Sequence, residues 1–117
     1  MKEIESAEAL RIFSMWAEKH SPLQVNIRKP DGKSALACKI AEVPEKDSKL
    51  SVLILFDEQR LDLIDFTDAT FGLGKPEDSA FPEFKERTWV QFLLVELPNG
   101  ESYLFAEKLV EGARPPR

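Results

Sequence analysis

One turn decides the fold of this chain and occurs twice: Lys29-Pro30-Asp31-Gly32-Lys33 and Leu97-Pro98-Asn99-Gly100-Glu101. Proline suits the first central position of a type I turn, and Asp or Asn suits the second. Glycine then accepts the left-handed conformation of a G1 bulge, which closes a three-residue hairpin loop. Both stretches therefore predict β-hairpins, and together they predict a curled β-sheet protein.

The strands around the first turn follow from the alternation of apolar residues. The stretch 23–28 alternates cleanly, so Leu23, Val25 and Ile27 are expected to face inward. The stretch 34–43 is less regular, because alanines occupy the positions between its larger apolar side chains. We interpret this as either a β-bulge or a strand that is covered on both faces.

The strands around the second turn span residues 87–109. If Leu97 opposes Glu101, Val95 opposes Tyr103 and Leu93 opposes Phe105 on one face of the hairpin. The other face carries further apolar residues, so we expect one face to line the core. The opposite face is expected to pack under a helix or against a second subunit.

A helix is expected from about Glu5 to Lys19, where strong helix formers carry apolar residues at helical spacing. The expected apolar face comprises Ile4, Ala7, Leu10, Phe13, Met15 and Trp16, widened by Ala9 and Ile12. The helix should end before Ser21-Pro22, because the residue before a proline is disfavoured in the α region.

The middle of the chain is expected to add strands at 50–56 and at 58–66, with a turn at 57–60. The second of these segments also fits a short helix, and we favour a strand because its end is β-prone. Residues 71–85 are expected to form a long irregular loop, with a short helical turn near 78–84.

These elements predict a strand-dominated α+β fold. One N-terminal helix packs on a small antiparallel β-barrel of five or six strands, within a single domain of residues 1–110. The tail of residues 111–117 is expected to be disordered.

Composition restricts the classes of function. A formal net charge of −5 argues against a nucleic-acid surface and against an anionic membrane surface. The first residues are acidic where a signal peptide would be basic, and the longest apolar run, 52–56, is too short to cross a bilayer. We therefore expect a cytoplasmic protein that binds neither nucleic acid nor membranes.

Residues for catalysis or metal binding are scarce, so we expect no enzyme activity, no metal and no cofactor. His20, which is the only histidine, is expected to be a helix cap or surface residue, and Cys38 an inert buried thiol. The acidic stretch 57–68 does not fit a calcium loop, because its sixth position is Asp62 rather than glycine. Gly72-Leu73-Gly74-Lys75 lacks the spacing of a phosphate-binding loop.

Three phenylalanines, Phe71, Phe81 and Phe84, fall in the predicted loop 71–85. The simpler hypothesis is that they fold back over the mouth of the barrel. The alternative is that they form a contact patch for a protein partner, which makes them the candidate site residues of this chain.

Several short stretches resemble the N-terminal domain of bacterial flagellar brake proteins. They are Glu5-Ser6, Arg11-Ile12-Phe13, Lys19-His20-Ser21-Pro22-Leu23-Gln24-Val25 and Gly32, within roughly the first half of the chain. In that family this domain is a split β-barrel that precedes a cyclic-di-GMP-binding PilZ domain. The Arg-x-x-x-Arg and Asp/Asn-x-Ser-x-x-Gly motifs of the PilZ domain do not occur here. The resemblance therefore implies the accessory barrel without its nucleotide-binding companion, working in signalling or motility.

Together these observations predict a non-catalytic binding or regulatory module that forms a homodimer and contacts a protein partner. The alternative is a split barrel that binds a small ligand or nucleotide, such as a flavin or a cyclic dinucleotide.

Overall fold

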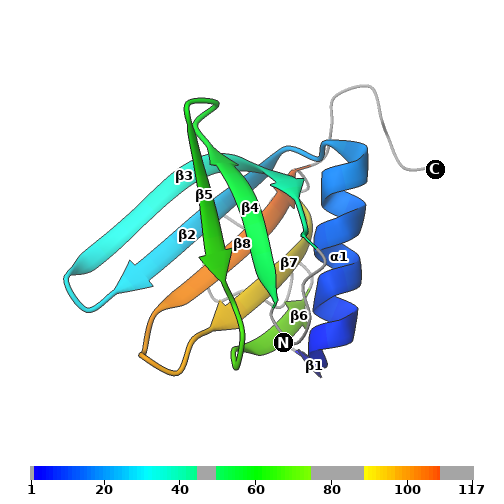
Figure 1. Cartoon of the computed structure of the whole chain (residues 1–117). Helices are drawn as coiled ribbons and strands as arrows, with labels where there is room; N and C mark the ends of the chain where they lie inside the picture. The colour runs from blue at the N-terminus through cyan, green and yellow to red at the C-terminus, as the bar shows by residue number, and fades with distance from the viewer. Residues whose placement is uncertain (1, 45–49, 75–88, 109–117) are drawn as a thin grey trace.

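The computed structural model describes residues 2–44, 50–74 and 89–108 (Figure 1). Its elements, in chain order, are β1 (Lys2–Ile4), α1 (Ser6–Lys19), β2 (Leu23–Lys29), β3 (Gly32–Glu42), β4 (Ser51–Phe56), β5 (Arg60–Asp65), β6 (Thr70–Gly74), β7 (Trp89–Glu96) and β8 (Ser102–Lys108). The predicted tail 111–117 lies outside the described residues.

The strands form one antiparallel sheet of eight strands in the order β1-β6-β7-β8-β2-β3-β4-β5. The α+β class and the dominance of strands are confirmed. The expected barrel of five or six strands is corrected, because the described sheet ends at two edges, β1 and β5, and does not close. Two short strands, β1 and β6, were not predicted. β6 pairs with β7, and β1 pairs with β6. Local alternation gave no sign of such distant pairings.

The sheet curls so that β4 and β5 cross over β2 and β8, and α1 lies along one side (Figure 1). The ring of Phe66 packs edge-on against Tyr103 of β8, with 5.4 Å between the ring centres. It also stacks on Phe13 of α1, with 5.7 Å between the ring centres. These aromatic contacts connect the helix, the segment after β5 and the far strand β8 in one core.

The helix α1 confirms the predicted span, and its core face is Ala9, Phe13 and Trp16, all fully buried. Ala7 and Leu10 were expected on this face but are exposed, Leu10 by 38%. The apolar stripe was broad enough to fit more than one rotation of the helix. Only packing on the curled sheet selects the one that is observed.

The second turn has the predicted geometry. Gly100 has φ 93° and donates its N–H to Leu97 O, while the Leu97 N–H donates to Glu101 O at 2.9 Å. The predicted pairs Leu93 with Phe105 and Val95 with Tyr103 are both present. The three-residue loop with a bulge at Gly100 is confirmed.

The first turn differs from the second by one residue. Lys29 pairs with Gly32, so the loop contains only Pro30 and Asp31, and the predicted bulge is wrong here. Pro30 loses nothing in this register, because its missing N–H falls inside the loop rather than in the ladder. The inward side of β2 is nevertheless as predicted, with Leu23 and Val25 buried.

The irregular pattern of 34–43 is explained by a bulge rather than by two covered faces. The pairing of β3 with β4 shifts between Ile40 and Glu42. Cys38 and Ile40 are buried, whereas Ala35, Ala37 and Ala41 are exposed.

The segment 58–66 contains the favoured strand, β5. The expected irregular loop 71–85 is wrong at its start, because residues 71–74 belong to β6 and pair with β7. Gly72 and Gly74 are both paired in the sheet: β7 pairs with every residue of β6, and β1 pairs with residues 71–73. The predicted helical turn near 78–84 lies outside the described residues.

The hairpin of β7 and β8 is apolar on both faces, as predicted. Leu93, Val95 and Phe105 belong to the main core, and Phe92 and Ala106 form a second buried cluster on the opposite face. Phe92 and Ala106 are fully buried within one chain. The predicted homodimer is not tested by the burial of this pair and stays a prediction.

Candidate functional site

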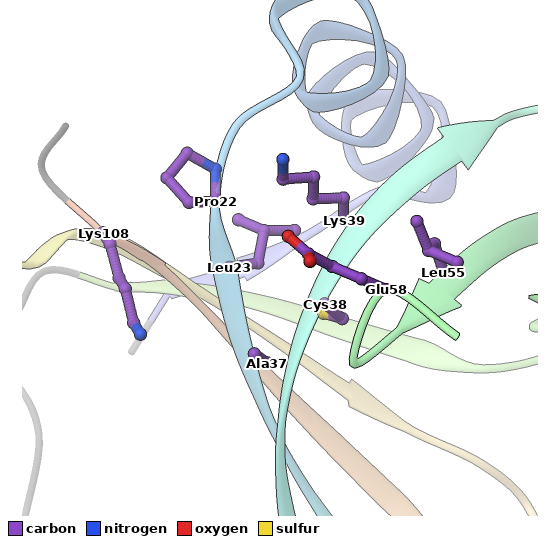
Figure 2. A pocket seen from close by; sticks show the side chains of 8 residues that line it. All are labelled: Pro22, Leu23, Ala37, Cys38, Lys39, Leu55, Glu58 and Lys108. Carbon is purple, nitrogen blue, oxygen red and sulfur yellow. The ribbon is translucent and has the colours of Figure 1, made fainter. Parts of the chain in front are cut away.

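A small pocket of about 140 Å³ opens at one end of the sheet (Figure 2). It is lined by Pro22, Leu23, Ala37, Cys38, Lys39, Leu55, Glu58 and Lys108. Figure 2 shows Lys39 and Glu58 reaching over the pocket, whereas the amino group of Lys108 points away from them. Pockets that hold small-molecule ligands usually measure about 300–1,000 Å³, so this one is small for a nucleotide or flavin.

Cys38 lies at the base of this pocket and is only 5% exposed. Burial, and after it the negative charge of Asp57, raises the pKa of its thiol to about 12 against the opposing effect of the Lys108 charge. A nucleophilic or metal-binding cysteine needs its thiolate, which is disfavoured here. The predicted inert thiol agrees with this environment.

The turn between β4 and β5 is strained at Glu58. Asp57 and Glu58 have φ of 50° and 60°, and the Gln59 N–H donates to Phe56 O at 3.0 Å. Side chains other than glycine, Asn and Asp rarely adopt the left-handed conformation. The turn at 57–60 was predicted, but its strain was not.

The acidic residues of 57–68 are distributed over separate elements. Asp57 and Glu58 lie in the strained turn, Asp62 forms an ion pair with Arg60, and Asp65 accepts a hydrogen bond from the Thr67 N–H. Within residues 2–44, 50–74 and 89–108, no group of His, Cys, Asp and Glu side chains is arranged to hold a metal ion.

The remaining motifs have structural positions. His20 is exposed and ends α1 in the left-handed conformation, with its N–H donating to Ala17 O, as a helix cap. Gly72 and Gly74 lie in the extended strand β6, which is not the geometry of a phosphate-binding loop.

The predicted aromatic patch is only partly described. Phe71 is 3% exposed in β6, opposite Val95 and Ile4, and belongs to the main core. It offers no surface to a partner. Phe81 and Phe84 lie outside the described residues, and their role as partner contacts stays a prediction.

A different apolar surface is exposed on the outer side of β4 and β5. Leu61 is 56% exposed and Leu63 is 53% exposed. Leu61 lies opposite Leu55 and Leu63 opposite Leu53, and both partners on β4 are half-buried. We call these four leucines the leucine face.

The leucine face was missed because the alternation in 60–65 was used only to assign a strand. The side chains alternate as Arg60, Leu61, Asp62, Leu63, so charges and leucines occupy opposite faces. Because Phe56 is buried and pairs with Arg60, the charged face is the one turned inward. The sequence shows the two faces of this strand but not which of them is turned toward the core.

The inward charges remain accessible. Arg60 Nε lies 2.9 Å from an Asp62 carboxylate oxygen, with the side chains 62% and 45% exposed. The Arg60 guanidinium also lies 5.1 Å from the centre of the Phe56 ring. Both contacts hold the charged side chains along the open edge of β5.

No helix of the described part of the chain is long and apolar enough to cross a membrane. Comparisons with models of protein families, with curated proteins and with solved structures found no match to this chain.

Proposed function

We propose that this protein is a cytoplasmic, non-catalytic binding or regulatory module that associates with itself through the leucine face. The observation that carries the proposal is that Leu61 and Leu63 are more than half exposed on an edge strand. Neighbouring apolar side chains exposed together are typical of protein interaction sites. An edge strand adds unpaired backbone groups that a second chain can bind.

The environment of the reactive residue types supports a non-catalytic role. Burial disfavours the Cys38 thiolate, and His20 is placed at the end of a helix. Asp62 is engaged by Arg60. These side chains have structural roles and lie on separate elements.

Light scattering after size-exclusion chromatography tests the proposal. We expect the wild-type chain to have twice its 13.3 kDa mass at high concentration. The variant carrying Leu61→Lys and Leu63→Lys should be monomeric, because lysines on β5 bring like charges together when the leucine faces of two copies meet. Leu10→Lys is the matched control, since Leu10 is also exposed but lies on α1. A monomeric wild type contradicts the proposal, as does a dimer that tolerates both lysines.

The alternative is a small-ligand or nucleotide-binding barrel, and in the part of the chain that the structure describes the pocket at Cys38 is a candidate site for its ligand. The pocket volume of about 140 Å³ favours the binding module instead. A thermal-shift series with flavins and cyclic dinucleotides distinguishes the two functions. The binding module predicts no change in melting temperature, and a saturable increase would support the alternative.

The proposed setting in bacterial signalling or motility rests on the resemblance of the first half of the chain to flagellar brake proteins. It predicts that the neighbouring genes encode motility or signalling proteins. A swimming assay of a deletion strain tests it, and unchanged swimming would contradict it.

A further inference from the structure

We propose that a second copy of this chain binds along β5, so that the two β5 strands pair antiparallel with Leu61 of each copy opposite the other. This rests on the proposed function, since it specifies how the leucine face associates. Three observations carry it: the direction of the free backbone groups, the charges on the strand and the exposure of its side chains.

The backbone of β5 presents its unpaired groups at the leucines. The Phe66 N–H donates to Leu50 O at 2.7 Å, so even-numbered residues after the turn point their backbone groups toward β4. The Asp57 N–H donates to Ala37 O, so odd-numbered residues of β4 point toward β3, in the same alternation. The N–H and C=O groups of Leu61 and Leu63 therefore point away from β4. Among the described residues, β5 pairs with β4 alone.

A two-fold axis normal to the sheet keeps the leucines of both copies on one face. The free backbone groups then allow three central registers: Leu61 opposite Leu61, Leu61 opposite Leu63, or Leu63 opposite Leu63. Each places hydrogen-bonding residues opposite one another. The three registers differ in which inner-face side chains lie opposite one another, and these pairs distinguish them.

The charges favour the first register. With Leu61 opposite Leu61, Arg60 of each copy lies opposite Asp62 of the other, so both directly opposite pairs of charged strand residues are of opposite sign. With Leu61 opposite Leu63, the two Asp62 side chains face each other directly, which is unfavourable. With Leu63 opposite Leu63, Asp62 lies opposite the apolar Ile64. Only the first register is complementary in charge.

The exposure of the strand allows the approach. Arg60 and Asp62 are 62% and 45% exposed, and Leu61 is 56% exposed, so the edge is open on both faces. The pairing is short, because in this register only residues 60–62 of each β5 lie opposite β5 residues of the other copy, and residues 57–59 before them form the turn. It buries less than the usual ~1,200–2,000 Å² of a stable interface, so the dimer should form and dissociate with concentration.

Cysteine scanning along β5 measures the register. In a hydrogen-bonded antiparallel pair the Cα atoms lie about 5.5 Å apart, within the range of a disulfide. Leu61→Cys should therefore form a disulfide-linked dimer under mild oxidation. Leu63→Cys is the matched control, because in this register its two copies are about 13 Å apart along the strands. The wild type, whose Cys38 is buried, reports any background.

Charge reversal is the second measurement. Arg60→Asp and Asp62→Arg should each weaken self-association, because each places like charges opposite one another. A mixture of the two variants should restore the dimer as a heterodimer, since both cross-strand pairs become attractive. The ion pair is exposed and contributes little to folding, so both variants should fold.

The outcomes distinguish a failure of the β5 register from a failure of the proposed self-association. A disulfide at residue 61 together with the restored heterodimer supports the register. A disulfide-linked dimer of Leu63→Cys or of Asp62→Cys overturns the register. So do Arg60→Asp and Asp62→Arg variants that dimerise as strongly as the wild type. In these cases self-association through another register or surface still stands. A wild type that is monomeric at high concentration overturns the proposed function and this pairing with it.

Discussion

At the scale of single residues, the stability of this protein depends on a few positions where backbone or burial is demanding. Gly100 lies in the left-handed region at φ 93°, and nothing lies within 4 Å of the place where its Cβ would be. Conformation alone therefore requires glycine there. At Cys38, by contrast, burial determines the protonation state, because it favours the neutral thiol over the thiolate.

Gly100→Ala should lower the free energy of unfolding by about 1 kcal/mol, since a Cβ disfavours the left-handed conformation. Gly32→Ala is the comparison, because φ 157° at Gly32 lies at the border of extended backbone and should cost less. Urea denaturation measures both. Equal stability of Gly100→Ala and the wild type would contradict the role of the bulge.

Cys38 should make the protein less stable in alkali. The folded chain holds the thiol pKa near 12 against an ordinary 9.0, so above pH 9.0 the unfolded chain loses a proton that the folded chain keeps. The free energy of unfolding should fall with rising pH across this window, by at most about 1.4 kcal/mol per pH unit for one group.

The measurement is urea denaturation at several pH values for the wild type and Cys38→Ala. Above pH 9.0, which is the ordinary pKa of the thiol, the free energy of unfolding should fall more steeply with pH for the wild type than for the variant. Tyr103, whose pKa is raised first by burial and then by Glu101 and Asp62, acts in the same direction in both proteins. Parallel pH profiles would contradict the assignment.

At the scale of elements, α1 is joined to the β7–β8 hairpin by a polar contact at the edge of the core. The indole N–H of the fully buried Trp16 donates to Glu107 Oε1 at 2.9 Å. The Gln91 side-chain amide donates to the same oxygen at 3.2 Å. One carboxylate oxygen thus satisfies donors from two elements.

Glu107→Leu should cost about 1–3 kcal/mol of stability, because it leaves the buried indole N–H without an acceptor. Glu107→Gln retains an amide oxygen for the indole and should cost less. Urea unfolding followed by tryptophan fluorescence compares the two. Equal losses would mean that packing, rather than the hydrogen bond, sets the contribution of this residue.

At the scale of the whole molecule, one aromatic cluster makes the helix and the sheet a single cooperative unit. The centre of the Phe13 ring on α1 lies 5.4 Å from the centre of the Phe105 ring and 5.7 Å from the centre of the Phe66 ring. These residues come from the helix, from β8 and from the segment after β5. Removing one ring should therefore weaken the whole fold rather than one element.

Phe13→Ala should destabilise the protein by about 3–5 kcal/mol, the usual cost of deleting a buried ring. Leu10→Ala, on the same helix but 38% exposed, is the control and should cost much less. Circular dichroism during urea unfolding should show helix and sheet lost together in the wild type. Separate transitions would contradict a single cooperative core.

Local rules in the sequence determined α1, the strands β2 to β5, and the pairing of β7 with β8. The turn residues around Gly100 predicted the register of β7 and β8, whereas the same residue types at 29–33 predicted a bulge that the first hairpin lacks. Alternation identified the inward face of β2 at Leu23 and Val25. The unreactive environment of Cys38 and the capping position of His20 also followed from their neighbours along the chain.

Only the tertiary structure decided which surfaces are covered. The pairing of β1 with β6, the rotation of α1 that buries Ala9 and exposes Leu10, and the exposure of Leu61 and Leu63 all depend on partners distant in sequence. Residue spacing describes one element at a time. A strand with leucines on one side and charges on the other is therefore assigned correctly from sequence, but the side turned toward the core is chosen by the elements that pack against it.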